Sequence, residues 1–186
     1  MRVLLVRIVV HALIVLFGIT KVSAQNIAPC NADPVFAQLD FLIGDWEVQN
    51  ETGTNTFGNT TIEKVIDGCA ITEKWSDNTG FDGMSLFYYS TNEQTWKQVW
   101  VTQTPKAFGG VKEATMNRSA NGTRVQFDSS YRSSTGQQVM DRSIISVQSN
   151  GTLLHLIEIS FDSGSTWTES FKAIYRPANT RPATVN

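Results

Sequence analysis

The sequence predicts an all-β fold, an up-and-down antiparallel barrel of about ten strands preceded by one short helix. From about residue 45 onward, polar and apolar side chains alternate with a period of two, which is typical of half-buried strands. Turns rich in Gly, Asn and Asp separate these segments, and such residues tolerate the positive φ angles of tight hairpins. Sequential strands with hairpin-length links form an up-and-down sheet, and closing that sheet into a barrel removes its exposed edges.

The first 24 residues have the three-part pattern of a secretory signal. Arg2 and Arg7 form a basic start, residues 8–19 are an unbroken apolar run, and residues 22–24 (VSA) supply small side chains for cleavage. The alternative is an N-terminal membrane anchor, but the apolar run is too short to span a bilayer comfortably. We therefore expect a secreted or periplasmic protein that has no membrane association after the signal is removed.

The charge balance argues against a nucleic-acid partner. The chain has 15 Lys and Arg against 17 Asp and Glu, for a net charge of −2. Signal cleavage removes only basic residues, which makes the remainder more acidic, and no basic stripe is left to contact phosphates. The expected partner is a small molecule.

The segment after the signal is the size of one domain, and its elements follow in order. Residues 25–34 are expected to be an N-terminal extension, 35–177 the barrel and 178–186 a flexible tail. Asp33 can cap a short helix, Pro34 suits its first turn, and Gly44 ends it. Ten strands are predicted near residues 45–50, 58–66, 69–76, 81–89, 95–102, 108–116, 123–129, 137–147, 152–160 and 166–175.

Lysines on three of these strands indicate which face points to water. If Lys74, Lys97 and Lys172 face outward, the residues one, three or five positions away face inward. The inner surface then combines large aromatic groups with a few polar ones, which is compatible with a packed core or a ligand cavity. The inward set predicted in this way is Ile71, Glu73, Trp75, Trp96, Gln98, Trp100, Trp167, Glu169, Phe171, Ala173 and Tyr175.

Two cysteines and several sequons bear on covalent chemistry. Cys30 and Cys69 form an even pair without metal-type spacing, which in an oxidising compartment indicates one disulfide; two separate buried thiols are the alternative. Five Asn-x-Ser/Thr sequons are candidate glycosylation sites if the source is eukaryotic. They begin at Asn50, Asn59, Asn117, Asn121 and Asn150.

Two motifs shape the ends of the predicted barrel. Residues 160–167 (SFDSGSTW) fit the pattern S-x-D-x-G-x-T-W, the Asp-box, a hairpin motif also found in sialidases. We interpret it as architectural, because sialidases use several boxes on a much larger propeller. Residues 44–46 (GDW) resemble the G-x-W at the start of lipocalins, where a basic residue of the last strand packs on the Trp; Arg176 is the candidate here.

The order of landmarks resembles a bacterial family of calycin-like proteins of unknown function. The shared motifs are residues 39–46 (LDFLIGDW), 73–75 (EKW) and 95–101 (TWKQVWV), followed by Arg142 and the terminal Asp-box hairpin. The resemblance covers nearly all of residues 35–176 and implies a ten-stranded, lipocalin-like barrel without an established activity. One departure is the strand before the box, where the family often has Gln and Trp and this chain has His155 and Ile157.

The predicted function is binding of a small, partly apolar ligand inside the barrel. Arg142 is expected to pair with a ligand carboxylate or with Glu73. Two alternatives are a solid barrel that binds a partner through its loops and a weak hydrolase or isomerase that uses Glu73 as a general base. The predicted lining is Glu73, Trp75, Phe87, Gln98, Trp100 and Arg142.

Cofactor and metal chemistry have little support in the sequence. Ten-stranded barrels that hold haem through one His offer an analogy for His155, which makes haem an alternative cofactor. Outside the signal there is one His, with two Cys expected to be bonded, and these do not supply a zinc site. No G-x-S-x-G elbow or phosphate-binding Gly loop occurs, and we assign no catalytic or metal residue.

Overall fold

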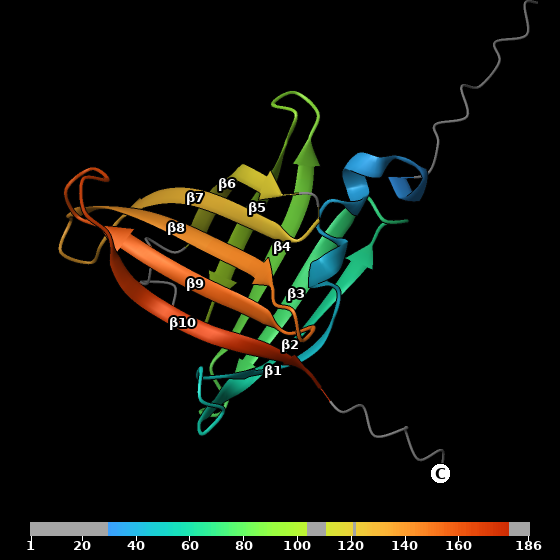
Figure 1. Ribbon diagram of the computed structural model, residues 1–186. Coiled ribbons are helices and arrows are strands. Elements are labelled where there is room, and N and C mark those ends of the chain that lie inside the picture. Colours follow the sequence, from blue (N-terminus) through green and yellow to red (C-terminus); the bar gives the residue numbers. More distant parts are fainter. Residues whose placement is uncertain (1–29, 104–110, 121, 179–186) are drawn as a thin grey trace, which may run out of the picture.

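The structure is a closed antiparallel barrel of ten strands, as predicted (Figure 1). It is a computed structural model that describes residues 30–103, 111–120 and 122–178. Each strand pairs with its neighbour in sequence, and β1 pairs with β10 to close the barrel. Every predicted strand is present, with ends that differ by up to four residues. The strands are β1 (Gly44–Gln49), β2 (Thr56–Val65), β3 (Ala70–Asp77), β4 (Asp82–Ser90), β5 (Thr95–Thr102), β6 (Val111–Ala120), β7 (Arg124–Arg132), β8 (Gln138–Val147), β9 (Leu153–Ser160) and β10 (Thr168–Pro177).

The predicted N-terminal helix is a run of three short 3₁₀ helices. They are η1 (Cys30–Ala32), η2 (Pro34–Ala37) and η3 (Asp40–Leu42). Asp33 caps η2 as expected, because its Oδ1 accepts a hydrogen bond of 3.0 Å from the Val35 amide. The last helix ends at Leu42, and one residue, Ile43, separates it from Gly44 and β1, so this segment leads into the barrel.

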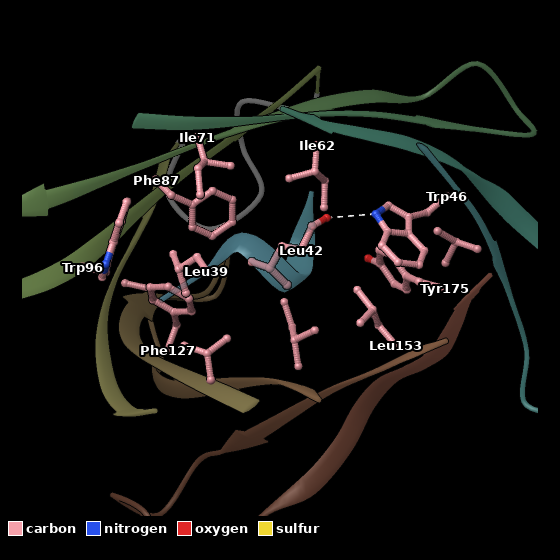
Figure 2. Packing of buried hydrophobic residues seen from close by; sticks show 14 of the residues in the cluster. Leu39, Leu42, Trp46, Ile62, Ile71, Phe87, Trp96, Phe127, Leu153 and Tyr175 are labelled. Atoms are coloured by element: carbon pink, nitrogen blue, oxygen red, sulfur yellow. Dashed lines mark hydrogen bonds between the residues drawn. The ribbon is translucent and has the colours of Figure 1, made fainter. Parts of the chain in front are cut away.

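The three short helices close one end of the barrel. In Figure 1 they lie beside the end of β2 and the start of β3. Leu39 and Leu42 are fully buried, and Figure 2 shows them at the centre of a ring of inward side chains. That ring includes Ile62, Ile71, Phe87, Trp96, Phe127 and Leu153. The helical segment is therefore a plug that fills this end of the barrel with apolar side chains.

Several polar and covalent contacts hold the plug in place. The predicted disulfide between Cys30 and Cys69 is present and ties η1 to the turn before β3. The indole of Trp46 donates a hydrogen bond of 2.9 Å to the Leu42 carbonyl. The indole of Trp96 donates one of 3.1 Å to the carbonyl of Val35. These indole groups anchor the plug from two sides of the barrel while their rings fill the core.

The inward side chains change character along several strands. On β3, the buried core residue Ile71 is followed by Glu73 and Trp75, and on β9 Leu153 is followed by His155 and Ile157. The same change occurs on β4, β5 and β8. The interior therefore has two halves: a closed half filled by the plug and its ring, and an open half lined by polar and aromatic side chains.

One part of the predicted facing pattern is wrong. The register of β10 shifts between Glu169 and Phe171, which is the mark of a β-bulge. Phe171, Ala173 and Tyr175 face inward as predicted, but Glu169 is exposed. Trp167 lies beyond the bulge and packs against Arg142. An extra residue in one strand reverses the alternation, which a strict period of two does not anticipate.

Within the described residues, no helix is long and apolar enough to cross a membrane.

Three predictions fall outside the described part of the chain. These are the signal at residues 1–24, the greater part of the N-terminal extension before Cys30, and the tail after residue 178. The sequon at Asn121 lies outside as well. Of the other sequons, Asn59, Asn117 and Asn150 are exposed and Asn50 is half-buried.

Candidate functional site

A cavity of about 370 Å³ occupies the open half of the barrel. Its volume is within the usual range of small-molecule pockets. Seven of the ten strands, β3 and β5 to β10, and the turn between β3 and β4 contribute to its lining. The lining residues are Glu73, Trp75, Phe81, Gln98, Trp100, Thr102, Lys112, Tyr131, Asp141, Ser143, His155, Ile157, Ser170, Phe171 and Tyr175.

The apolar part of the lining is largely aromatic. Trp75 on β3 and Trp100 on β5 lie on either side of β4, where Gly83 pairs with Trp75. A Cβ added to Gly83 would come within 2.4 Å of the Trp100 ring. Glycine at this position therefore lets the indole lie across the backbone of β4. Phe171 from β10 adds another ring to the lining.

Glu73 provides a carboxylate in this lining. Its Oε2 accepts a hydrogen bond of 2.7 Å from Ser85, and its Oε1 accepts one of 3.3 Å from Thr60. The Ser85 hydroxyl in turn accepts a hydrogen bond of 3.0 Å from the Gln98 amide. Burial raises the pKa of Glu73, and these two hydroxyls oppose the change only in part. The carboxyl is held in place by neutral donors.

A buried ion pair lies on another part of the lining. Lys112 on β6 donates a hydrogen bond of 2.9 Å to Asp141 on β8, and both side chains are almost fully buried. Ser129 on β7, the strand between them, donates a further bond of 3.4 Å to the same carboxylate oxygen. Opposite charges in contact offset part of the cost of burying each one. Burial of Tyr131, followed by the charge of Asp141, raises the pKa of the tyrosine.

His155 is the centre of a hydrogen-bonded chain across β8, β9 and β10. Its Nε2 is 2.7 Å from the Ser143 hydroxyl, and its Nδ1 is 3.0 Å from the Tyr175 hydroxyl. Burial, followed by the charge of Lys112, lowers the pKa of His155 from 6.5 to about 3, so the ring is neutral at physiological pH. Burial also raises the pKa of Tyr175 well above its usual value. The chain is thus a neutral polar group.

These contacts do not fit the alternative of haem held by His155. An axial ligand needs a ring nitrogen with a free lone pair. Both ring nitrogens of His155 are engaged by hydroxyl groups of the protein, and its ring packs edge-on against Phe171 and Tyr175. We therefore derive no haem site.

The structure brings together four of the six residues predicted to line a ligand site. Glu73, Trp75, Gln98 and Trp100 all border the cavity. Phe87 faces inward as expected but lies in the closed half, where its ring contacts Phe127 at a centroid distance of 5.6 Å. It belongs to the core because it is further along β4 toward the plug.

Arg142 does not face the cavity, so its predicted pairing with Glu73 or a ligand is wrong. Its neighbours Asp141 and Ser143 are buried and face inward, which places Arg142 on the outer surface. There its Nε is 2.7 Å from Glu158, and its guanidinium lies 4.1 Å from the centre of the Trp167 ring. The physical reason is strand parity: the inward face of β8 is occupied by the odd-numbered positions.

The sequence reasoning missed several residues of the lining. Lys112, Asp141 and Ser143 were not identified, although the alternation of β8 with its apolar residues Val139 and Ile145 marks the odd positions as inward. Lys112 could not be found in this way, because a lysine was taken to mark the outer face. A buried lysine needs a partner, and that partner, Asp141, is 29 residues away.

Arg176 does not pack on Trp46 as the lipocalin comparison predicted. Trp46 faces inward, whereas Arg176 is paired in register with Glu47 and donates a hydrogen bond of 2.9 Å to Gln49 on the outer face. The barrel closure there depends on strand pairing and on the contact between Trp46 and the plug.

The hairpin at residues 160–167 is ordered by Asp162. Its Oδ1 accepts hydrogen bonds from the Ser160 hydroxyl and the Thr166 amide, and its Oδ2 accepts one from the Thr166 hydroxyl. These bonds, led by those from Thr166, lower the pKa of Asp162 to about 2. The Trp167 indole donates to the Gly164 carbonyl. Every bond of this set stays within the hairpin, which is an architectural role.

Comparisons with known proteins add no assignment to the site. In the described residues, no group of three or more His, Cys, Asp or Glu side chains is arranged to hold a metal ion. No protein-family model matches the chain, and a search of curated proteins found no match.

Proposed function

We propose that this protein is a secreted barrel that binds a small, partly apolar molecule in the open half of its interior. The observation that carries the proposal is the cavity of about 370 Å³ with aromatic walls and a few buried polar groups. The disulfide between Cys30 and Cys69 supports the location, since such bonds persist in oxidising compartments.

The plug supports a binding role. It fills the closed half, which holds most of the buried apolar side chains of the core. The open half can therefore retain costly buried polar groups such as Glu73 and the pair of Lys112 and Asp141. Polar groups in that position are those that orient a ligand within an apolar pocket.

The geometry favours binding over catalysis. The raised pKa of Glu73 is a property of general bases, but the groups bonded to its two oxygens are neutral hydroxyls, which orient the carboxyl and supply no acid to complement a base. His155 contacts the Ser143 hydroxyl, as a histidine base contacts a serine nucleophile. Its other ring nitrogen, however, contacts the hydroxyl of Tyr175 and not a carboxylate. A tyrosine with a raised pKa stays neutral and does not stabilise an imidazolium as a carboxylate does.

Native mass spectrometry and calorimetry test the proposal together. We expect the protein purified from a secreting host to retain extra mass, or the empty protein to bind 2-(1-naphthyl)ethanol at one site. Ile157→Trp, which adds a ring to the cavity lining, should abolish either form of binding. Leu156→Trp is the matched control, because this neighbour points to the outer face. Absence of both forms of binding in the folded protein would contradict the proposed function, as would equal binding by the two variants.

A further inference from the structure

We propose that the cavity is selective for ligands with an aromatic or apolar body and one positively charged amine, and that Glu73 receives the amine. This inference rests on the proposed function and names the class of ligand. It follows from the balance of charge in the lining, the hydrogen bonds of Glu73 and the aromatic rings around it.

Among the described residues, the ionised lining contains one more negative charge than positive charge. Lys112 and Asp141 neutralise each other at 2.9 Å, and His155 is uncharged because its pKa is depressed. Ionised Glu73 therefore adds a net negative charge to the lining. The other polar and titratable groups on the elements around it are neutral: Thr60 on β2, Ser85 on β4, Gln98 on β5, Tyr131 on β7, Ser143 on β8 and Tyr175 on β10.

Glu73 has room for a further donor. A carboxylate offers about four lone-pair directions. Each of the two oxygens accepts one hydroxyl hydrogen bond, from Ser85 or from Thr60. Lys112 acts on Glu73 only as the smallest of the influences on its pKa, and its ammonium is bonded to Asp141. An ammonium group entering the cavity would supply a bonded positive partner, which Glu73 does not have among the described residues.

The rings of the lining suit the rest of such a ligand. Trp75 is on the same strand and the same face as Glu73, two residues away, and Trp100 lines the cavity from β5. Indole faces attract cations and also pack against apolar groups. The carboxylate thereby recognises the charged end of the ligand, and the rings recognise the other end by apolar contact.

The protonation of Glu73 gives the proposal a signature in pH. Burial favours the neutral carboxylic acid, whereas a bound ammonium favours the carboxylate. Binding an amine thus releases a proton from Glu73 where it was protonated, and the affinity falls as the pH is lowered through its raised pKa. The affinity for a neutral ligand of the same shape does not fall in this way as the pH is lowered.

The experiment is a calorimetric titration of the whole protein with three probes of one shape: 2-(1-naphthyl)ethylamine, 2-(1-naphthyl)ethanol and 3-(1-naphthyl)propionate. The amine should bind at least about tenfold more tightly than the alcohol, and the carboxylate most weakly. In Glu73→Gln the advantage of the amine over the alcohol should disappear. Glu158→Gln is the matched control on the outer face, and it should keep the advantage.

The outcomes separate the inference from the function beneath it. If the alcohol binds and the amine is no tighter, or if the preference survives in folded Glu73→Gln, the selectivity for amines is overturned and the binding function stands. If none of the three probes binds and no mass is retained in native spectra, the binding function itself fails, and this inference with it. Circular dichroism of each variant confirms that the barrel is folded.

Discussion

The closed and open halves of the barrel differ although the same strands build both. In the closed half, Leu39 and Leu42 from the plug pack against inward residues such as Phe127, and all three side chains are fully buried. In the open half, Glu73 and His155 occupy the next inward positions beside a cavity. A ten-stranded barrel is wide enough to need filling, and this chain fills one end with its own N-terminal segment. The buried apolar core is thus concentrated in one half, and we propose that the other half serves recognition.

A Phe→Ala substitution in each half tests this difference between the halves most directly. Phe127→Ala removes a fully buried ring of the closed half and should lower the free energy of unfolding by about 3–5 kcal/mol. Phe171→Ala removes a half-buried ring beside the cavity and should cost about 1–2 kcal/mol, since part of its surface already borders open space. Urea denaturation measures both values. Equal losses would mean that the two halves share the core.

Removal of the disulfide tests how far the plug depends on its covalent tie. Cys30→Ser with Cys69→Ser opens a loop spanning 39 residues and should cost about 3–4 kcal/mol in the chain-entropy treatment. Thermal unfolding followed by circular dichroism gives the change. We expect the variant to stay folded at moderate temperature, because the Trp46 and Trp96 indoles still bond the plug. A variant as stable as the parent would show that the tie is dispensable.

The buried histidine predicts a loss of stability in acid. The pKa of His155 is about 3 in the folded protein and 6.5 when unperturbed, so the unfolded chain binds the proton first. The stability that neutral His155 contributes is present above its unfolded pKa and declines as pH falls toward its folded pKa. Between neutral pH and about pH 5, the parent should lose about 2 kcal/mol of unfolding free energy that His155→Gln does not lose. Parallel pH profiles of the two proteins would contradict the assignment.

Glu73 predicts a smaller effect of the opposite sign. Its pKa is raised by burial, so the contribution of the neutral acid to stability is present at acidic pH and is lost as the pH rises through that raised value. Glu73→Gln cannot ionise and should gain about 1 kcal/mol over the parent at neutral pH. The gain should vanish in acid. Urea titrations at both pH values measure it, and a loss at neutral pH would show that the carboxylate is stabilised without a ligand.

Substitutions on the outer face of the barrel should have the smallest effects. Arg142→Ala breaks a partly exposed ion pair with Glu158 and a cation–π contact with Trp167, for a cost of about 1 kcal/mol or less. Binding of the naphthyl probes should be unchanged, because Arg142 does not border the cavity. A loss of probe affinity would place the binding site elsewhere on the barrel.

The closed half could be predicted from the sequence better than the open half. Strand alternation and turn residues identify the barrel, and the even pair of cysteines indicates the disulfide. These signals are local, and the closed half obeys them: Ile71 and Trp96 face inward by simple parity.

The open half departs from those local signals. The bulge between Glu169 and Phe171 reverses the parity of β10, and the inward Lys112 contradicts the use of lysine as an outward marker. Its partner Asp141 is close only because β6, β7 and β8 are adjacent in the sheet. Pairings of this kind depend on tertiary register. The error at Arg142 has a different cause, because the alternation of β8 already marks the even-numbered positions as outward.

The five tryptophans allow one measurement to test the division of the barrel. Their indole N–H groups give separate signals in a ¹H–¹⁵N nuclear magnetic resonance spectrum, and 2-(1-naphthyl)ethylamine can be titrated against all of them at once. We predict that the Trp75 and Trp100 signals shift as the cavity fills, while those of Trp46 and Trp96 in the closed half remain in place. Saturable shifts confined to the closed half or the outer Trp167, with Trp75 and Trp100 unmoved, would contradict the account.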